Sequence, residues 1–300
     1  MRGALLLLVA VAFAPALRNG FLWDDHLLIS NNAALRSAAG LWRALTGDFW
    51  QTSIDIGSQS SYYRPLVSLA YYAQFQLFGV DPFGYHVVSL LLHASCVLLV
   101  LDWLLARLAP EHAGRAAAFG AFAGAAWFAF HPTRSESVSW ISGCTDLWMT
   151  LLVLLCTRCL RSERARVRML LAPACAAAAL LCKEAAVVLP PLVALDAWLL
   201  SPPEARRKGL RAAGALGGAM ALVLVLRAAF VSLPARSLAA LFRQPVPRVL
   251  SSFGHYLEAT FAPFTPTVLR GKVAMTPHGE LIYEPGSVAL GARGLALIAI

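Results

Sequence analysis

The stretch YHVVSLLLHASCVLLVLDWLLARL, residues 85–108, decides the class of this fold. Its only charged side chains, Asp102 and Arg107, lie near its C-terminal end. An apolar run longer than about 18 residues with few charges predicts a transmembrane helix, because about 20 helical residues cross the hydrocarbon core of a bilayer. The sequence therefore places this part of the chain in a membrane.

The composition of the whole chain agrees with a membrane protein. Of its 300 residues, 59% are hydrophobic and 14% are charged, whereas soluble domains carry about 25% charged residues. The net charge is +9, but the basic residues occupy short gaps between apolar runs and form no patch interleaved with aromatic residues. This distribution is typical of membrane proteins and argues against nucleic-acid binding.

Further apolar runs predict an all-α, polytopic transmembrane helix bundle. Several runs are shorter than the ~20 residues of a straight span, so buried or re-entrant helices remain alternatives. We interpret residues 1–300 as one transmembrane module that is truncated at its C-terminus, because the last run is still apolar at Ile300. The runs are Ala4–Leu17, Tyr85–Leu108, Ala116–Phe130, Val138–Leu160, Met169–Cys182, Ala185–Leu200 and Ala212–Val231, with another from Ser287 onward.

The basic residues predict how the chain is oriented. Arg2 precedes the first run, and other basic clusters occupy the gaps 107–115, 158–168 and 201–211. With these spans, all four groups fall on one face, which is then cytoplasmic. Residues 18–84 form a first loop on the opposite, outer face. The first run also resembles a signal peptide, but we interpret it as an uncleaved anchor because candidate functional residues follow it so closely.

The first outer loop carries residues suited to chemistry. Asp24 and Asp25 are adjacent, so one carboxylate can face a substrate while the scaffold holds the other. A general base and a helix N-cap are equally good interpretations. Arg64, beside Tyr63, suits a phosphate headgroup because guanidinium binds phosphate oxygens in pairs, although an interfacial belt is the more common role of such residues. An interfacial helix is expected over residues 67–84.

Other ionisable residues converge on the same face. His131, Arg134 and Glu136 lie within one short segment. No second His stands at ligand spacing, so no metal site is predicted, and a divalent cation is left open. Lys183 and Glu184 interrupt an apolar stretch at membrane depth, where ionisable groups are costly and are functional candidates. Adjacent residues seldom pair on a helix, so each is expected to have a partner elsewhere.

Polar residues inside the runs have structural interpretations. His86 and His93 share a face of their helix and are expected in the core. Asp102 is expected to pair with a basic group. The Cys-x-x-Cys of Cys156 and Cys159 lies in an apolar helix, where it is interpreted as packing.

These motifs, in order over about residues 20–200, resemble the GT-C glycosyltransferase superfamily. They are most similar to its branch of protein O-mannosyltransferase-like membrane proteins with C-terminal tetratricopeptide repeats. Cys144 departs from this pattern, because the branch often carries a basic residue before the following Asp. No 34-residue repeat is present in the sequence. The resemblance rests on Asp24-Asp25, Asp48-Phe49-Trp50, Tyr63-Arg64-Pro65-Leu66, His131-Pro132 with Glu136, Ser137-Val138-Ser139-Trp140-Ile141, Asp146 and Lys183-Glu184.

The resemblance implies a glycosyltransferase that uses a polyprenyl-phosphate-linked, mannose-like sugar at the outer face. Transfer would go with inversion to a hydroxyl of a protein Ser or Thr, or of a glycan. One of Asp24 and Asp25 would be the base, and Arg64, Lys183 and Tyr63 would hold the lipid phosphate. The same cavity would be lined by His131, Arg134, Glu136, Asp146 and Glu184.

Two other functions remain open from the sequence. The chain could be a non-catalytic membrane anchor or scaffold of the same fold, or a transporter of a lipid-linked substrate. A transporter would show internal repeats, and a degenerate scaffold would lose the paired aspartates, so the transferase leads. The Ala- and Arg-rich composition suggests a bacterial inner membrane with the active face in the periplasm. No cofactor is predicted.

Overall fold

The computed structural model divides the chain into two compact units. The first, called here the helical unit, comprises Met1–Phe130 and Arg134–Leu233, and the second comprises His131–Thr133 and Pro234–Ile300. The structure describes residues 1–50, 62–108, 114–231, 253–254, 256–257, 260–261, 271–275 and 281–285.

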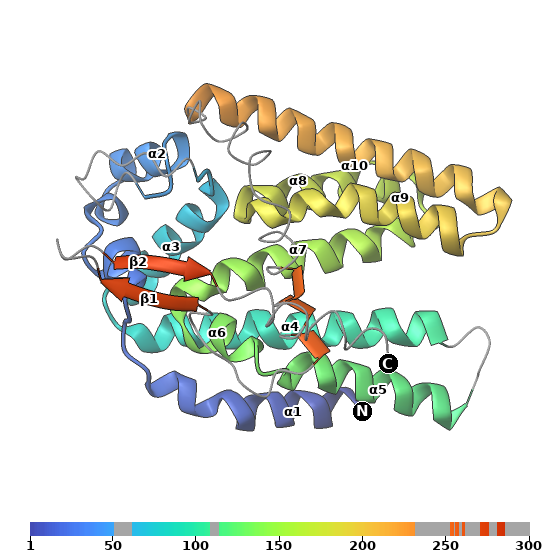
Figure 1. Cartoon of the computed structure of the whole chain (residues 1–300), viewed down its shortest axis with the longest axis horizontal. Helices are drawn as coiled ribbons and strands as arrows, with labels where there is room; N and C mark the ends of the chain where they lie inside the picture. Colours follow the sequence, from blue (N-terminus) through green and yellow to red (C-terminus); the bar gives the residue numbers. More distant parts are fainter. Residues whose placement is uncertain are drawn as a thin grey trace. The chain divides into compact units, whose positions relative to one another are not determined.

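The helical unit confirms the expected all-α bundle. Between the helices lie 3-10 turns and short π-helical turns, among them η1 (Ala14–Arg18), η4 (Ile141–Gly143) and η6 (Glu184–Val188). The helices shown in Figure 1 are α1 (Arg2–Phe13), α2 (Ala38–Thr46), α3 (Pro65–Phe78), α4 (Pro82–Leu108), α5 (Arg115–Phe130), α6 (Arg134–Ser139), α7 (Cys144–Leu160), α8 (Ala172–Cys182), α9 (Leu189–Leu200) and α10 (Pro203–Phe230).

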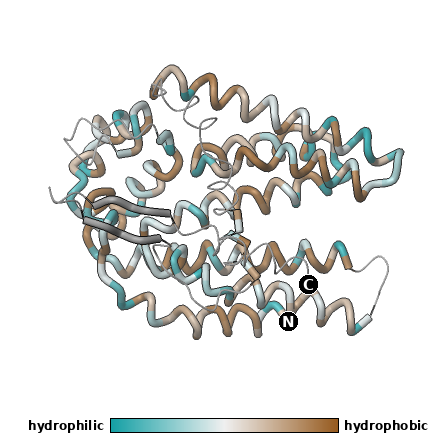
Figure 2. Tube along the Cα trace, viewed as in Figure 1, coloured by the Kyte–Doolittle hydropathy of each residue, from teal (hydrophilic) through white to brown (hydrophobic). Residues whose placement is uncertain are grey.

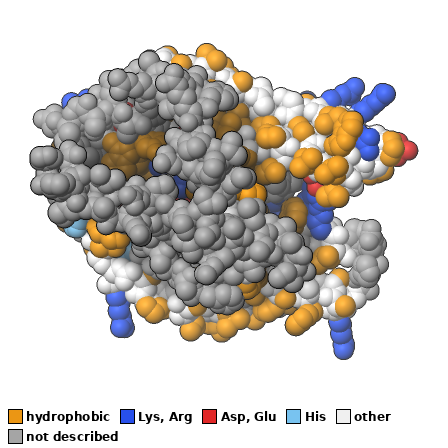
Figure 3. Space-filling view, viewed as in Figure 1, with side chains coloured by type: hydrophobic (Ala, Val, Ile, Leu, Met, Phe, Trp, Pro, Cys, Tyr) orange, Lys and Arg blue, Asp and Glu red, His pale blue; other side chains and the backbone are white. Residues whose placement is uncertain are grey.

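Within the described part of the chain, three helical segments are long and apolar enough to cross a membrane: α4, Ile141–Leu160 and α10. Shorter apolar helices cover Arg115–Phe130 and Val167–Cys182. Apolar residues run along the helices, and hydrophilic residues gather at the turn between α9 and α10 (Figure 2). Apolar side chains are numerous on the visible surface over α9 and α10 (Figure 3). Exposed apolar residues of these two helices include Leu222, Val225 and Leu199. Such a surface suits lipid rather than water.

Prolines explain why two expected spans are short. Pro15 lies in the 3-10 turn η1, so the regular helix of the first run ends at Phe13. Pro190 and Pro191 occupy the first turn of α9, where a missing N–H costs little, so this helix begins only at Leu189. The run Ala185–Leu200 is therefore a 3-10 turn followed by a 12-residue helix.

Small residues bring the helices of the core together. Ala121, Ala125 and Ala129 recur at every fourth position of α5 and are fully buried against α1 and α4. Ala172 and Ala176 do the same on α8, which packs against α7 and α10. Small side chains permit close approach of helix backbones, which is how membrane helices associate. A third cluster of larger side chains joins the first loop to α3, α4 and α7.

The expected interfacial helix is shorter than predicted. It forms α3, which ends at Phe78 rather than continuing to residue 84. Gly79 follows with a φ of +57°, a conformation that residues with a side chain rarely adopt. Its N–H donates to the Phe75 carbonyl at 2.8 Å, which closes the helix before α4 starts at Pro82.

Charged side chains join the ends of the helices that the sequence assigned to the cytoplasm. Arg2 at the start of α1 and Arg158 near the end of α7 both bind Asp102, at 2.6 Å and 3.1 Å. Arg107 at the end of α4 binds Asp196 of α9 at 2.5 Å. The basic partner expected for Asp102 is thus present, and basic residues from separate gaps meet at one end. We call it the Asp102 end.

The second unit contains two short strands that the sequence analysis did not predict. β1 (Gly271–Met275) pairs with β2 (Leu281–Pro285) in antiparallel register, Gly271 opposite Pro285. The described parts of this unit also include His131. The expected apolar run from Ser287 and the polar stretch Gln51–Ser61 lie outside the described residues.

Candidate active site

The buried carboxylate of Asp25 organises the outer end of the helical unit. Its side chain is 0% exposed. One oxygen, Oδ2, accepts the Leu22 N–H at 2.9 Å, and Oδ1 accepts the Ser142 N–H at 2.7 Å together with the Ser142 hydroxyl. Three donors satisfy this carboxylate, as a buried charge requires. Asp25 therefore holds the first loop against the segment before α7.

Both aspartates belong to one tight turn, Leu22–Asp25. The Asp25 N–H donates to the Leu22 carbonyl at 2.9 Å, and the Leu22 N–H donates to the Asp25 carboxylate. Two hydrogen bonds therefore close the turn. Trp23, in the middle of this turn, has a φ of +47°, which is unusual for a residue with a bulky side chain. Strain of this kind persists only where the surroundings hold it. The neighbouring contacts supply that restraint.

Trp140 and Asn19 clamp the turn to the start of α7. The Trp140 indole Nε1 donates to the Leu22 carbonyl at 3.2 Å, and its ring meets the Trp23 ring edge-on at 6.0 Å. The Asn19 amide donates to the Ser139 carbonyl at 3.1 Å. Two segments about 120 residues apart in the chain are thus fixed as one structure.

Asp24 is left in a different state from its neighbour. It is partly exposed, and it makes no hydrogen bond or ion pair with the residues that the structure describes. Partial burial, and then the negative charge of Asp25, raise the pKa of Asp24 above its ordinary value. A carboxylate with a raised pKa is a stronger base, and lone pairs without a partner can accept a proton. The two adjacent carboxylates therefore differ in burial and in hydrogen bonding.

Arg64 lies just before α3 in an aromatic setting. Its side chain is 13% exposed, and it stands over the rings of Tyr62 and Phe49 at 4.6 Å and 5.5 Å. Its Nη2 and Nε donate to Oε2 of Glu184 at 2.8 Å and 3.2 Å. Aromatic faces and one carboxylate therefore hold this guanidinium in a fixed orientation.

Lys183 forms a second ion pair beside the first. Its Nζ lies 2.6 Å from Oδ1 of Asp146, in the first turn of α7. Because Lys183 and Glu184 are consecutive, the junction of α8 and η6 joins α7 to the start of α3. Each of the two residues has its partner in another segment, as expected.

Hydrogen bonds and short stretches of chain connect these pairs to Asp25. Asp25 accepts from Ser142, and Asp146, four residues further along the chain in the first turn of α7, binds Lys183. Glu184, which follows Lys183 in the chain, binds Arg64. The structure thus gathers at one end a partly exposed carboxylate and two cations.

The other residues expected at the site have the following surroundings. Tyr63 is buried, and its hydroxyl donates to the Leu45 carbonyl at 3.1 Å, so its position favours packing over the phosphate contact expected of it. Glu136 is exposed on α6. The Arg134 guanidinium stands over the Phe128 ring at 5.5 Å. His131 belongs to the second unit, where its Nε2 lies 2.9 Å from the Thr260 carbonyl oxygen.

Ser142 is a residue that the sequence analysis missed. Nothing in the sequence distinguishes it from other serines near helix ends, and only the contact across 117 residues reveals it. Tyr71 and Cys144 lie behind it, with Cys144 Sγ donating weakly to the Tyr71 hydroxyl at 3.7 Å. Among the described residues, no group of three or more His, Cys, Asp or Glu side chains is placed to hold a metal ion.

Comparisons with known proteins point in one direction. The chain is 36% identical over 185 residues, 60% of its length, to Protein O-mannosyl-transferase Tmtc1 of Drosophila melanogaster. It is 34% identical over 146 residues to TMTC1 of Homo sapiens and 32% identical over 152 residues to TMTC4 of Homo sapiens, in each case 48% of its length. It covers 20%, 16% and 20% of these relatives, respectively.

No family model and no solved structure matches the chain. The curated relatives agree with the motifs and with the helical membrane architecture. The resemblance is therefore confirmed: over about half of its length, this chain is similar to the protein O-mannosyltransferase-like, tetratricopeptide-repeat-associated branch of membrane proteins.

Proposed function

We propose that this chain forms the membrane-embedded catalytic part of a protein O-mannosyltransferase. It would transfer mannose, or a similar sugar, from a polyprenyl-phosphate donor to the hydroxyl of a protein Ser or Thr, with a glycan hydroxyl as the alternative acceptor. The observation that carries the proposal is the division of the aspartate pair: Asp25 is buried and fully hydrogen-bonded, whereas Asp24 is partly exposed with a raised pKa.

Asp24 acts as the general base in this mechanism. Its carboxylate accepts the proton of the acceptor hydroxyl, whose oxygen attacks the anomeric carbon of the sugar. The bond between that carbon and the phosphate oxygen breaks on the opposite side, so the configuration inverts. The leaving group is the polyprenyl phosphate. Asp25 and Ser142 hold the turn from which Asp24 projects.

Arg64 and Lys183 supply the positive charge that a leaving phosphate requires. Glu184 uses Nε and Nη2 of Arg64, and a guanidinium can still donate to another acceptor from its remaining N–H groups. Asp146 and Glu184 keep both cations in place before the donor arrives. Fixed cations need little reorganisation when charge develops on the phosphate, which lowers the barrier.

We further propose that this end of the bundle faces away from the cytoplasm. Support comes from the basic residues collected at the Asp102 end. The Ala- and Arg-rich composition favours a bacterial inner membrane with the active face in the periplasm, although the relatives named above are animal proteins.

Transfer from a panel of polyprenyl-phosphate sugars tests the proposal in membranes holding the full-length protein. Asp24→Asn should reduce transfer at least about 100-fold, the lower range of general-base contributions. Glu204→Gln is the matched control, because it neutralises an exposed carboxylate in the first turn of α10, which has no part in the candidate site, and should leave transfer unchanged. Transfer that survives in Asp24→Asn would refute the base. No transfer from any donor by folded protein would favour the scaffold.

The donor contact is tested by a second pair of variants. Arg64→Gln should raise the KM for the lipid donor by about tenfold or more, as the loss of a charged hydrogen bond predicts. Glu184→Gln breaks the same ion pair but keeps the guanidinium, so its KM should change much less. Equal effects of both variants would mean that Arg64 acts only through its structural pair.

A further inference from the structure

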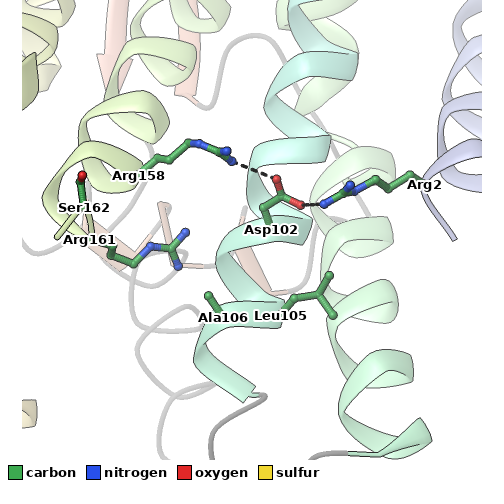
Figure 4. Close-up of a pocket in the computed structure, with 7 residues that line it drawn as sticks. All are labelled: Arg2, Asp102, Leu105, Ala106, Arg158, Arg161 and Ser162. Carbon is green, nitrogen blue, oxygen red and sulfur yellow. Dashed lines mark hydrogen bonds and ion pairs between the residues drawn. The ribbon is translucent and has the colours of Figure 1, made fainter. Parts of the chain in front are cut away.

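A hollow lined by arginines lies at the Asp102 end of the helical unit. It measures about 690 Å³ and opens to the surface between α1, α4 and α7. This volume falls within the ~300–1,000 Å³ of small-molecule sites. The lining includes Arg2, Arg158, Arg161 and Ser162 around the single carboxylate of Asp102, with Leu105 below (Figure 4).

The positive charges in this hollow exceed the negative charge that binds them. Arg2 and Arg158 approach Asp102 from opposite sides, and both remain more than half exposed, at 65% and 58%. Arg161 extends toward α4, where its Nη1 donates to the Trp103 carbonyl at 3.4 Å. Three guanidinium groups thus share one lining carboxylate, and their N–H groups can bind a further anion.

Neighbouring cations add to the positive potential at this place. Partial burial, and then the charges of Arg107 and Arg158, lower the pKa of Arg161, whereas Asp102 opposes this effect. A guanidinium stays protonated in proteins despite such a shift. Burial is the larger cause of this shift, and the two neighbouring arginines add to it, so an anion bound among them would meet several positive charges.

The depth of the hollow fits the headgroup region of a bilayer. From Pro82 to Asp102, α4 rises about 30 Å, which equals the thickness of the hydrocarbon core. If α4 begins at the outer boundary of this core, Asp102 lies at the inner boundary. Leu105 follows within the last turns of the helix. A phosphodiester at this level would meet the arginines while its acyl chains enter the bilayer.

We propose that this hollow binds the phosphate of an anionic phospholipid on the side opposite the candidate active site. About 24 Å of helix rise separates Ser142 from Arg158, so the two sites are distinct. Basic pockets between transmembrane helices on the cytoplasmic side are known to bind anionic headgroups. The inference is independent of the proposed transfer reaction.

Native mass spectrometry of the delipidated full-length protein, titrated with phosphatidylglycerol, tests the inference. Arg158→Gln/Arg161→Gln should weaken binding about fivefold per arginine, roughly 25-fold for the pair. Arg207→Gln/Lys208→Gln is the matched control, since it removes the same charge from exposed residues of α10 that do not line the hollow. Equal weakening in both variants would overturn the inference in favour of general surface charge.

Two further arms keep the test decisive. Asp102→Asn removes the competing carboxylate, so it should tighten phosphatidylglycerol binding, and unchanged binding would overturn the site. If the double variant fails to fold, Arg161→Gln alone takes its place, because it leaves both partners of Asp102 unchanged. This single variant should also weaken phosphatidylglycerol binding. Phosphatidylcholine binding as tight as phosphatidylglycerol, or displacement of phosphatidylglycerol by millimolar inorganic phosphate, would overturn the lipid assignment.

Discussion

Asp24 and Asp25 are adjacent in the chain, yet their carboxylates have different surroundings. Asp25 accepts three hydrogen bonds in the interior, whereas Asp24 accepts none from the residues that the structure describes. Both residues belong to the turn Leu22–Asp25, in which Trp23 has a positive φ. Adjacent carboxylates can thus have different roles, and the proposed mechanism assigns catalysis to Asp24 and structural support to Asp25.

Transfer should lose activity in acid at a higher pH than an ordinary aspartate would cause. The raised pKa of Asp24 means that its carboxylate takes up a proton at a higher pH, and the protonated form cannot act as a base. The rate should therefore fall as the pH drops through this pKa. A profile of kcat against pH for the lipid donor measures the midpoint. A midpoint at or below that of an ordinary Asp would contradict the assignment.

Asp25→Asn should change both the stability and the pH profile. The Asn amide has one acceptor oxygen where the Asp carboxylate has two, so it cannot accept from both Leu22 and Ser142. One buried donor then loses its partner, at a cost of about 1–3 kcal/mol. Loss of the negative charge also lowers the pKa of Asp24, which shifts the acid limb to lower pH. Thermal unfolding in detergent and the same kcat profile test both effects. An unshifted limb would show that Asp25 does not act on Asp24.

The sequence predicted some of these residues better than others. Lys183 and Glu184 were expected to have partners in other segments because adjacent residues seldom pair on a helix, and both partners exist. The charges alone could not identify Ser142, because a contact between distant segments depends on how the helices pack. Tyr63 was expected to contact the lipid phosphate because it stands beside Arg64. In the structure it is buried, and its hydroxyl donates to the Leu45 carbonyl.

At the scale of elements, the segment from α6 to α7 carries the site. The expected span Val138–Leu160 is split in the structure into the end of α6, the turn η4 and α7. Hydropathy registers only the apolar run, so it cannot detect this break. At this break, the Ser142 N–H donates to the Asp25 carboxylate.

Gly143→Ala should disturb this segment. A Cβ at Gly143 would lie 2.6 Å from the Glu136 carbonyl oxygen, a backbone atom that cannot give way cheaply. We expect a loss of about 1–3 kcal/mol of stability and reduced transfer, because Ser142 would shift from Asp25. Gly218→Ala on α10 is the control, since nothing lies within 4 Å of its added Cβ. Thermal unfolding that is equal in both variants would show that η4 tolerates the displacement.

At the scale of the whole molecule, the question is whether the two ends of the helical unit face opposite sides of the membrane. The Asp25 end holds the paired aspartates with Arg64 and Lys183, and the Asp102 end collects the arginines. Parallel helices α4 and α7 connect these ends, with Cys96 of α4 in contact with the Leu147 carbonyl of α7. The orientation proposed above, which follows the positive-inside rule, predicts that the Asp102 end faces the cytoplasm.

Cysteine labelling in sealed vesicles can test this orientation. Arg43→Cys on α2 should react with a membrane-impermeant maleimide from the active-site side only, and Lys208→Cys on α10 from the other side only, because both positions are exposed. The unsubstituted chain gives the background, which should be low because four of its six cysteines are buried. Labelling of both variants from the same side would contradict the orientation. It would also place the arginine hollow and the candidate active site on the same face of the membrane. Because α4 and α7 run parallel from one site to the other, that placement is impossible if both helices cross the bilayer.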